Sequence, residues 1–130
     1  MFEHMFERMG ADRWIDVHKN SMALLRAIVA WNPDWASPRW QAMCPHVARL
    51  TRVLRTVYAL DGPGARPSDP DRLVELLAAA VVAASVCAQH AGADPPGLAL
   101  RRAAAGLGAA LTRLSTESVP ITRRQLANAL

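Results

Sequence analysis

The stretch DPDRLVELLAAAVVAASVCAQHAG, residues 69–92, decides the fold of this chain. Asp69-Pro70 is a helix start, because a capping carboxylate is followed by proline at the first helical position. Gly92 is a natural stop just beyond the helix. Leucine, valine and alanine lie on nearly every side of the intervening helix, and Glu75 is the one charge among them after its first turn. The pattern predicts a central helix that other helices surround.

Outward from this helix, proline marks the other boundaries. Asp12 is expected to cap the first helix and Asn32-Pro33 to end it, because the residue before proline avoids the helical region. Ser37-Pro38 starts a second segment, which Pro45 is expected to divide into a turn at 38–44 and a helix. Asp94-Pro95 starts the fourth helix, and residues 115–120 are expected to be a break. The predicted fold is therefore a single all-α domain, a compact bundle of four main helices plus a short C-terminal helix, over residues 13–31, 45–60, 70–91, 95–114 and 123–130.

Composition agrees with one globular helical domain. The chain has 130 residues, of which 52% are hydrophobic, and alanine and leucine, both strong helix formers, dominate. The longest apolar run, Leu73 to Ala88, has 16 residues, short of the roughly 20 needed to span a bilayer. The first ten residues lack the apolar stretch of a signal peptide. We therefore expect a cytoplasmic protein that does not enter a membrane.

Charge alternates along the chain. Residues 35–60 and 98–130 each have a net charge of +4, whereas residues 1–34 have −1 and residues 61–97 have −3. In a helical bundle this alternation can pair neighbouring helices or favour self-association. The 98–130 region of one copy is expected to face the 61–75 region of another.

Two cysteines and two histidines are candidate metal ligands: Cys44, His46, Cys87 and His90. If the helices on either side of the 61–69 loop form an antiparallel hairpin, both pairs lie near the same end of it. Two thiolates and two imidazoles can complete a tetrahedral zinc site. The alternatives are a pair of ordinary buried thiols or a Cys44–Cys87 disulfide, and no other cofactor is expected.

All four tryptophans lie in the first third of the chain: Trp14, Trp31, Trp35 and Trp40. Tryptophans at this density anchor a loop onto a core, or they line an apolar ligand pocket or a protein interface. In the second interpretation His18 is the acid or base beside the tryptophans. The predicted ligand-binding set is Trp14, His18, Trp31, Trp35 and Trp40.

The remaining polar patterns indicate no catalytic set. Paired carboxylates, a glycine-rich phosphate loop and a Ser/His/Asp arrangement are all absent from the sequence. Four arginines form a basic group, Arg39 in the 38–44 turn and Arg49, Arg52 and Arg55 on one face of the second helix, but aromatic residues do not alternate with them after Trp40. Nucleic acid is therefore not an expected partner.

One family resemblance concerns the central helix. Leu73-Val74-Glu75-Leu76-Leu77, followed by residues 88–95 (AQHAGADP), resembles the second metal-binding helix and its exit in MazG-like all-α nucleotide pyrophosphohydrolases. The resemblance implies the all-α fold. That family holds magnesium with a cluster of acids, and here only Glu75 fits, so the resemblance implies a degenerate member without pyrophosphatase activity.

These observations favour a non-catalytic helical binding module that forms a homodimer. Its predicted interface is the small-residue face of the fourth helix, made of Ala99, Ala103, Gly106 and Ala110. A protein partner or a small apolar ligand is also compatible with the pattern. The alternative is a small enzyme or ligand-binding protein of specialised metabolism with a tryptophan-lined pocket.

Overall fold

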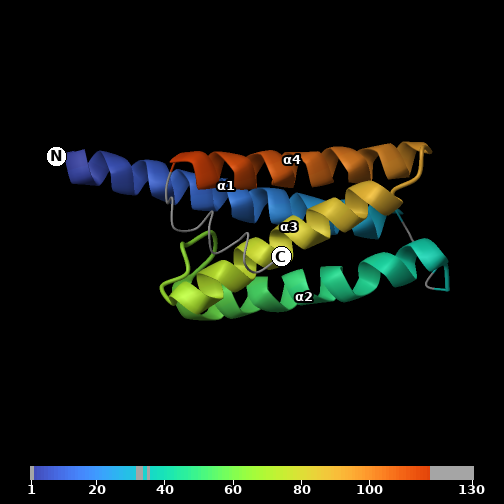
Figure 1. Cartoon of the computed structure of the whole chain (residues 1–130), viewed down its shortest axis with the longest axis horizontal. Coiled ribbons are helices and arrows are strands. Elements are labelled where there is room, and N and C mark those ends of the chain that lie inside the picture. Colours follow the sequence, from blue (N-terminus) through green and yellow to red (C-terminus); the bar gives the residue numbers. More distant parts are fainter. Residues whose placement is uncertain (1, 32–33, 35, 118–130) are drawn as a thin grey trace.

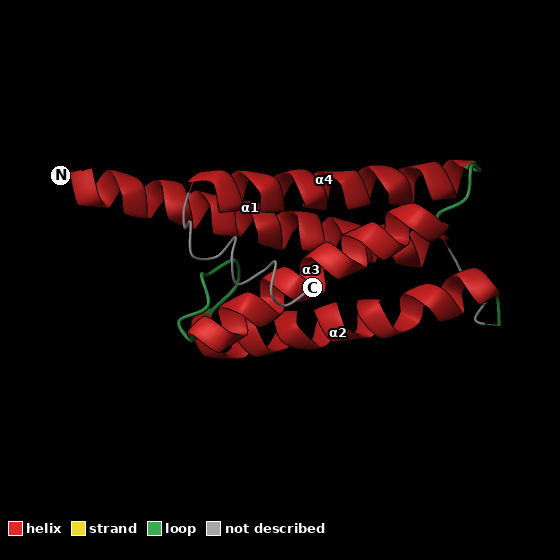
Figure 2. Cartoon of the chain, viewed as in Figure 1, coloured by secondary structure: helices red, strands yellow, loops and turns green. Residues whose placement is uncertain are grey.

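The computed structural model describes the backbone at residues 2–31, 34 and 36–117, and the side chains from residue 12 to residue 114 within those ranges. The described residues form four α-helices and no strand: α1 (Phe2–Trp31), α2 (Pro38–Asp61), α3 (Pro70–His90) and α4 (Pro95–Glu117) (Figure 2). The predicted all-α bundle of four main helices is confirmed. The predicted C-terminal helix over 123–130 lies outside the described residues.

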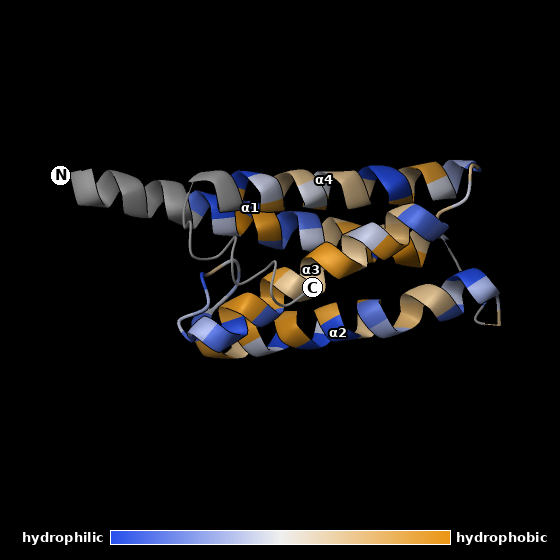
Figure 3. Cartoon of the chain, viewed as in Figure 1, coloured by the Kyte–Doolittle hydropathy of each residue, from blue (hydrophilic) through white to orange (hydrophobic). Residues whose placement is uncertain are grey.

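The helices alternate in direction and form two antiparallel pairs (Figure 1). α1 packs along α4, α2 packs along α3, and α3 also packs against α4. α3 therefore runs obliquely between α2 and the α1–α4 pair, which is the central position that its sequence predicts. The most hydrophobic colouring in Figure 3 follows α3.

Local capping fixes the starts of α2 and α3. The Ser37 hydroxyl accepts a hydrogen bond from the Trp40 N–H at 3.1 Å, and the Asp69 carboxylate accepts one from the Asp71 N–H at 3.0 Å. Proline follows each cap, as the sequence indicates. Gly62 caps the end of α2, and its φ of +94° is easily adopted only by a residue without a side chain.

Three predicted boundaries are wrong: the start of α1, the end of α4 and the division of α2 at Pro45. α1 begins at Phe2 rather than Arg13, because Gly10 alone does not break a helix that lacks proline. α4 continues through residues 115–117, beyond the predicted end near Leu114.

Pro45 does not divide α2, which is continuous from Pro38 to Asp61. Proline removes one internal hydrogen bond from the helix. Pro45 lies on the exposed side, where water can replace that bond, whereas Met43 and Leu50 on either side of it are fully buried. Packing of both flanking turns into one core therefore keeps the helix continuous.

One core unites the bundle. It takes side chains from every helix, among them Val17, Leu24, Leu50, Leu76, Leu100 and Leu107. The leucines of α4 recur at helical spacing on its core face, and Leu100, Leu107, Leu111 and Leu114 are all buried.

α3 is the most apolar helix, and its cover is incomplete. Its length of 21 residues and its composition are enough to cross a membrane, and half of its most apolar window is buried in the bundle. The core helix of a soluble protein meets the same criterion, so this finding does not assign the chain to a membrane. Ser85, Ala88 and Gln89 are exposed on α3.

Candidate interaction groove

The predicted tryptophan pocket is not assembled as one site. Trp14 and Trp31 are 17 positions apart on the same helix, which separates them by about 25 Å at 1.5 Å per residue. Trp14 and Trp40 are buried and Trp31 is half-buried. Trp35 lies outside the described residues. The placement of Trp14 and Trp40 favours the other interpretation, in which tryptophans anchor the core.

Trp14 and His18 do line a common cavity, against Leu54, Val57 and the glycines of the α2–α3 loop. Its volume is about 10 Å³, which is room for one water molecule and not for a small-molecule ligand. At this end of the bundle the loop packs closely against α1 at Gly64, since a Cβ at that position would lie 3.3 Å from Ile15 Cγ1.

The four predicted zinc ligands do not form a metal centre in the described part of the chain. Nowhere among the described residues does a group of three or more His, Cys, Asp or Glu side chains gather closely enough to hold a metal ion. Cys44 and Cys87 are both free thiols, so the disulfide alternative is wrong. Cys87 is fully buried, and this burial raises its pKa to about 12.

The structure instead shows an open groove between α3 and α4, with a volume of about 510 Å³. α3 contributes Val81, Ala84, Ser85 and Ala88. α4 contributes Arg101, Ala104, Ala105, Gly108, Leu111 and Thr112. We call this surface the α3–α4 groove.

The α3–α4 groove has a buried floor and exposed edges. Ala84, Ala104 and Leu111 are at most 7% exposed and form the floor. Ser85, Ala88 and Ala105 are exposed along the edges. Over the twelve residues from Arg101 to Thr112 the groove extends for about 16 Å along α4. This length matches three turns of a helix, and the small side chains permit close helix approach.

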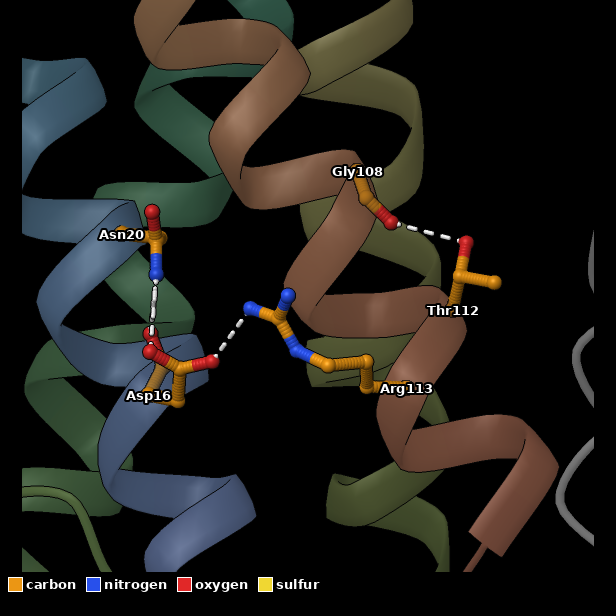
Figure 4. A network of polar contacts seen from close by, with 5 residues as sticks. All are labelled: Asp16, Asn20, Gly108, Thr112 and Arg113. Carbon is orange, nitrogen blue, oxygen red and sulfur yellow. Dashed lines mark hydrogen bonds and ion pairs between the residues drawn. The ribbon is translucent and has the colours of Figure 1, made fainter.

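Polar contacts hold both ends of α4 in place. At its start, Arg101 donates a hydrogen bond to the Ala91 carbonyl at 2.8 Å. Near its end, Arg113 pairs with Asp16 of α1 at 2.7 Å. Figure 4 shows Asp16 between Arg113 and Asn20, whose amide nitrogen donates to the Asp16 carboxylate at 3.2 Å. These contacts fix the position of the α4 wall of the groove.

The small-residue face of α4 that the sequence offers to a partner packs in part against α1. Ala110 is buried, and a Cβ added to Gly106 would lie 2.9 Å from the Asn20 amide oxygen. The predicted interface over Ala99, Ala103, Gly106 and Ala110 is therefore largely used within the chain. The open surface lies on another side of the same helix, around Ala105 and Gly108.

Sequence reasoning missed this surface, although a signal for it is present. The α3 residues 81, 84, 85 and 88 follow helical spacing, and so do residues 101, 104, 105, 108 and 112 of α4. Both sets consist mainly of small side chains. Pattern alone does not identify which of two small-residue faces the neighbouring helix covers.

Comparisons with known proteins give no further assignment. The chain matches no protein-family model, and comparisons with curated proteins and with solved structures give no match. The MazG-like resemblance therefore stays a prediction. Glu75, its one matching acid, is exposed on α3.

Proposed function

We propose that this chain is a helical interaction module that forms a homodimer through the α3–α4 groove. The observation that carries the proposal is the groove itself, an open, mostly apolar surface of small residues along two neighbouring helices. It is open to solvent, so it suits a helix of a partner better than an enclosed small molecule.

The incomplete cover of α3 supports this proposal. Half of the most apolar window of α3 is not buried by its own chain. Docking a second copy onto the groove removes that surface from water, which favours association. Two-fold symmetry is the commonest arrangement for such a pair.

Charge favours a second copy as the occupant. A two-fold axis along the groove places α3 of each copy against α4 of the other. α4 has three arginines and no acid over residues 98–114. α3 begins with the exposed acids Asp71 and Glu75, and its one arginine, Arg72, lies 3.9 Å from Asp69. In this arrangement Asp71 and Glu75 of one copy lie level with Arg113 of the other, because α3 and α4 are antiparallel (Figure 1), so the charge match is confined to that end of the groove.

The oligomeric state tests the proposal. Light scattering and sedimentation at micromolar concentration are expected to give twice the mass of one chain. Ala105→Glu places a charge in the contact and is expected to raise the dimer dissociation constant at least tenfold, by about 1.4 kcal/mol or more. The monomer is expected to keep its stability, because Ala105 is exposed.

Ala99→Glu is the matched control. It makes the same change on the same helix at another exposed position outside the groove. It is expected to leave the dimer intact. A wild-type monomer at all concentrations contradicts self-association, whereas a dimer that is sensitive only to Ala99→Glu places the interface on the face predicted from the sequence.

A further inference from the structure

The outer face of α2 contains the most one-sided charge in the described structure. From Pro38 to Leu60 the sequence has four arginines and no acid. Arg49, Arg52 and Arg55 recur every three residues, so they follow one another about 4.5 Å apart along the helix axis. Arg52 and Arg55 are exposed and Arg49 is half-buried. We call these three residues the α2 arginine row.

Three arginines elsewhere have contacts within the fold, whereas Arg26, Arg66 and Arg102 are exposed singly on separate segments. Arg113 pairs with Asp16 at 2.7 Å, Arg72 approaches Asp69, and Arg101 donates to the Ala91 carbonyl. The α2 arginine row differs, because within the described residues none of its three guanidinium groups has an ion pair or hydrogen bond. Three neighbouring cations thus lack a counter-charge in that part of the chain.

Arg39 is separate from the row. A Cβ at Gly92 would lie 2.7 Å from Arg39 Nη1, so this guanidinium packs against the turn between α3 and α4. Arg39 therefore contributes to packing within the fold, and among the arginines of α2 the α2 arginine row alone is the surface that a partner can contact.

Short side chains lie beside the row on α2, and the exposed Tyr58 follows it one turn beyond Arg55. Pro45, Ala48 and Ala59 are exposed on the same side of α2, and the opposite side of the helix contributes Leu50 and Val57 to the core. Short side chains beside the arginines allow another backbone to come close. Arginine binds carboxylates with two parallel hydrogen bonds.

We infer that the outer face of α2 is a docking surface for an acidic α-helix of a protein partner. Glutamates at three- and four-residue spacing on such a helix recur every 4.5–6 Å, as the rise of about 1.5 Å per residue dictates. That repeat matches the α2 arginine row. A single-stranded nucleic acid uses several aromatic side chains for stacking, and Tyr58, one turn beyond Arg55, is the one exposed aromatic described on α2. This surface is distinct from the α3–α4 groove, so the inference does not rest on dimer formation.

A binding titration tests this inference. The probe is an alanine-based helical peptide of about 20 residues with glutamates along one face at three- and four-residue spacing. It is expected to bind the wild-type chain at low salt and to weaken as salt is added, because exposed charge pairs are screened. The triple variant Arg49→Gln, Arg52→Gln and Arg55→Gln is expected to lose about tenfold in affinity.

The matched control removes the same net charge at other places. Arg26→Gln, Arg66→Gln and Arg102→Gln change three exposed arginines outside the row, and the affinity is expected to fall by less than about threefold. Circular dichroism and melting curves verify that both triple variants fold.

Three results overturn the inference. One is an equal loss in both triple variants, which indicates bulk charge. Another is failure of the peptide to bind at low salt. The third is tighter binding of a DNA duplex than of the peptide with the same dependence on the row, which assigns the surface to nucleic acid.

Discussion

α4 has two flanks of small residues with opposite fates. On one flank Gly106 and Ala110 pack against α1, and the ion pair between Arg113 and Asp16 joins the two helices. On the other flank Ala105 and Gly108 border the open α3–α4 groove. The difference teaches that small side chains alone do not define an interface. A flank becomes closed when the neighbouring helix lies against it along its length and places polar groups where they meet.

The largest expected effect on stability comes from the buried side of α3, where Cys87 lies, and is absent on the side of α3 that borders the α3–α4 groove. Cys87 is buried, and burial raises its pKa from 9.0 to about 12. Between those values the unfolded chain loses the thiol proton more readily than the folded chain does. The contribution of the protonated Cys87 thiol to the free energy of unfolding is therefore complete below pH 9. As the pH rises towards 12, the free energy of unfolding falls by about 1.4 kcal/mol per pH unit.

Urea unfolding of wild-type protein and Cys87→Ala at pH 8 and pH 10 measures this difference. The free energy of unfolding of the wild type is expected to fall by about 1.4 kcal/mol more than that of the variant. Adding Ala88→Cys to Cys87→Ala moves the thiol to the exposed edge of the groove, and the extra pH dependence is expected not to return. Equal pH dependence of all three proteins argues against a dry environment at Cys87.

An intermediate effect distinguishes the two glycines of α4. A Cβ at Gly108 meets nothing within 4 Å, whereas a Cβ at Gly106 lies 2.9 Å from the Asn20 amide oxygen. Gly108→Ala is expected to stabilise the fold by about 1 kcal/mol, because alanine is the better helix former. Gly106→Ala is expected to gain less or to destabilise, because Asn20 must move and loosen its contact with Asp16.

Thermal or urea unfolding of both glycine variants at one protein concentration gives the comparison. The expected gap between them is about 1 kcal/mol. An equal gain in both variants indicates that the Asn20 side chain moves without cost. The packing of α1 against α4 at Gly106 is then looser than the 2.9 Å distance indicates.

The smallest expected effect concerns the ion pair of the closed flank. Arg113→Gln is expected to lower the free energy of unfolding by at most about 1 kcal/mol, because both partners are partly exposed. The loss is expected to shrink in high salt. Arg102→Gln, an exposed change on the same helix, serves as the control. A loss well above 1 kcal/mol that salt does not alter makes this contact a structural requirement of the closed flank.

The sequence by itself determined the class of fold and most of the core. Helical periodicity marks Trp14, Val17, Leu24 and Ile28 on α1, and all four are buried. Ser37 and Asp69 cap α2 and α3 as predicted, since a cap depends on neighbouring residues only. These features are local, so pattern reasoning reaches them.

Only the tertiary structure decided the sites. Trp14 and Trp31 of the predicted tryptophan set lie far apart on one helix. The path of α2 through Pro45 depended on packing of both its halves into one core. The placement of the groove depended on how far α1 and α3 each cover α4. Each outcome depends on how helices that are distant in sequence cross one another. Local periodicity does not indicate which face of a helix a distant helix will cover.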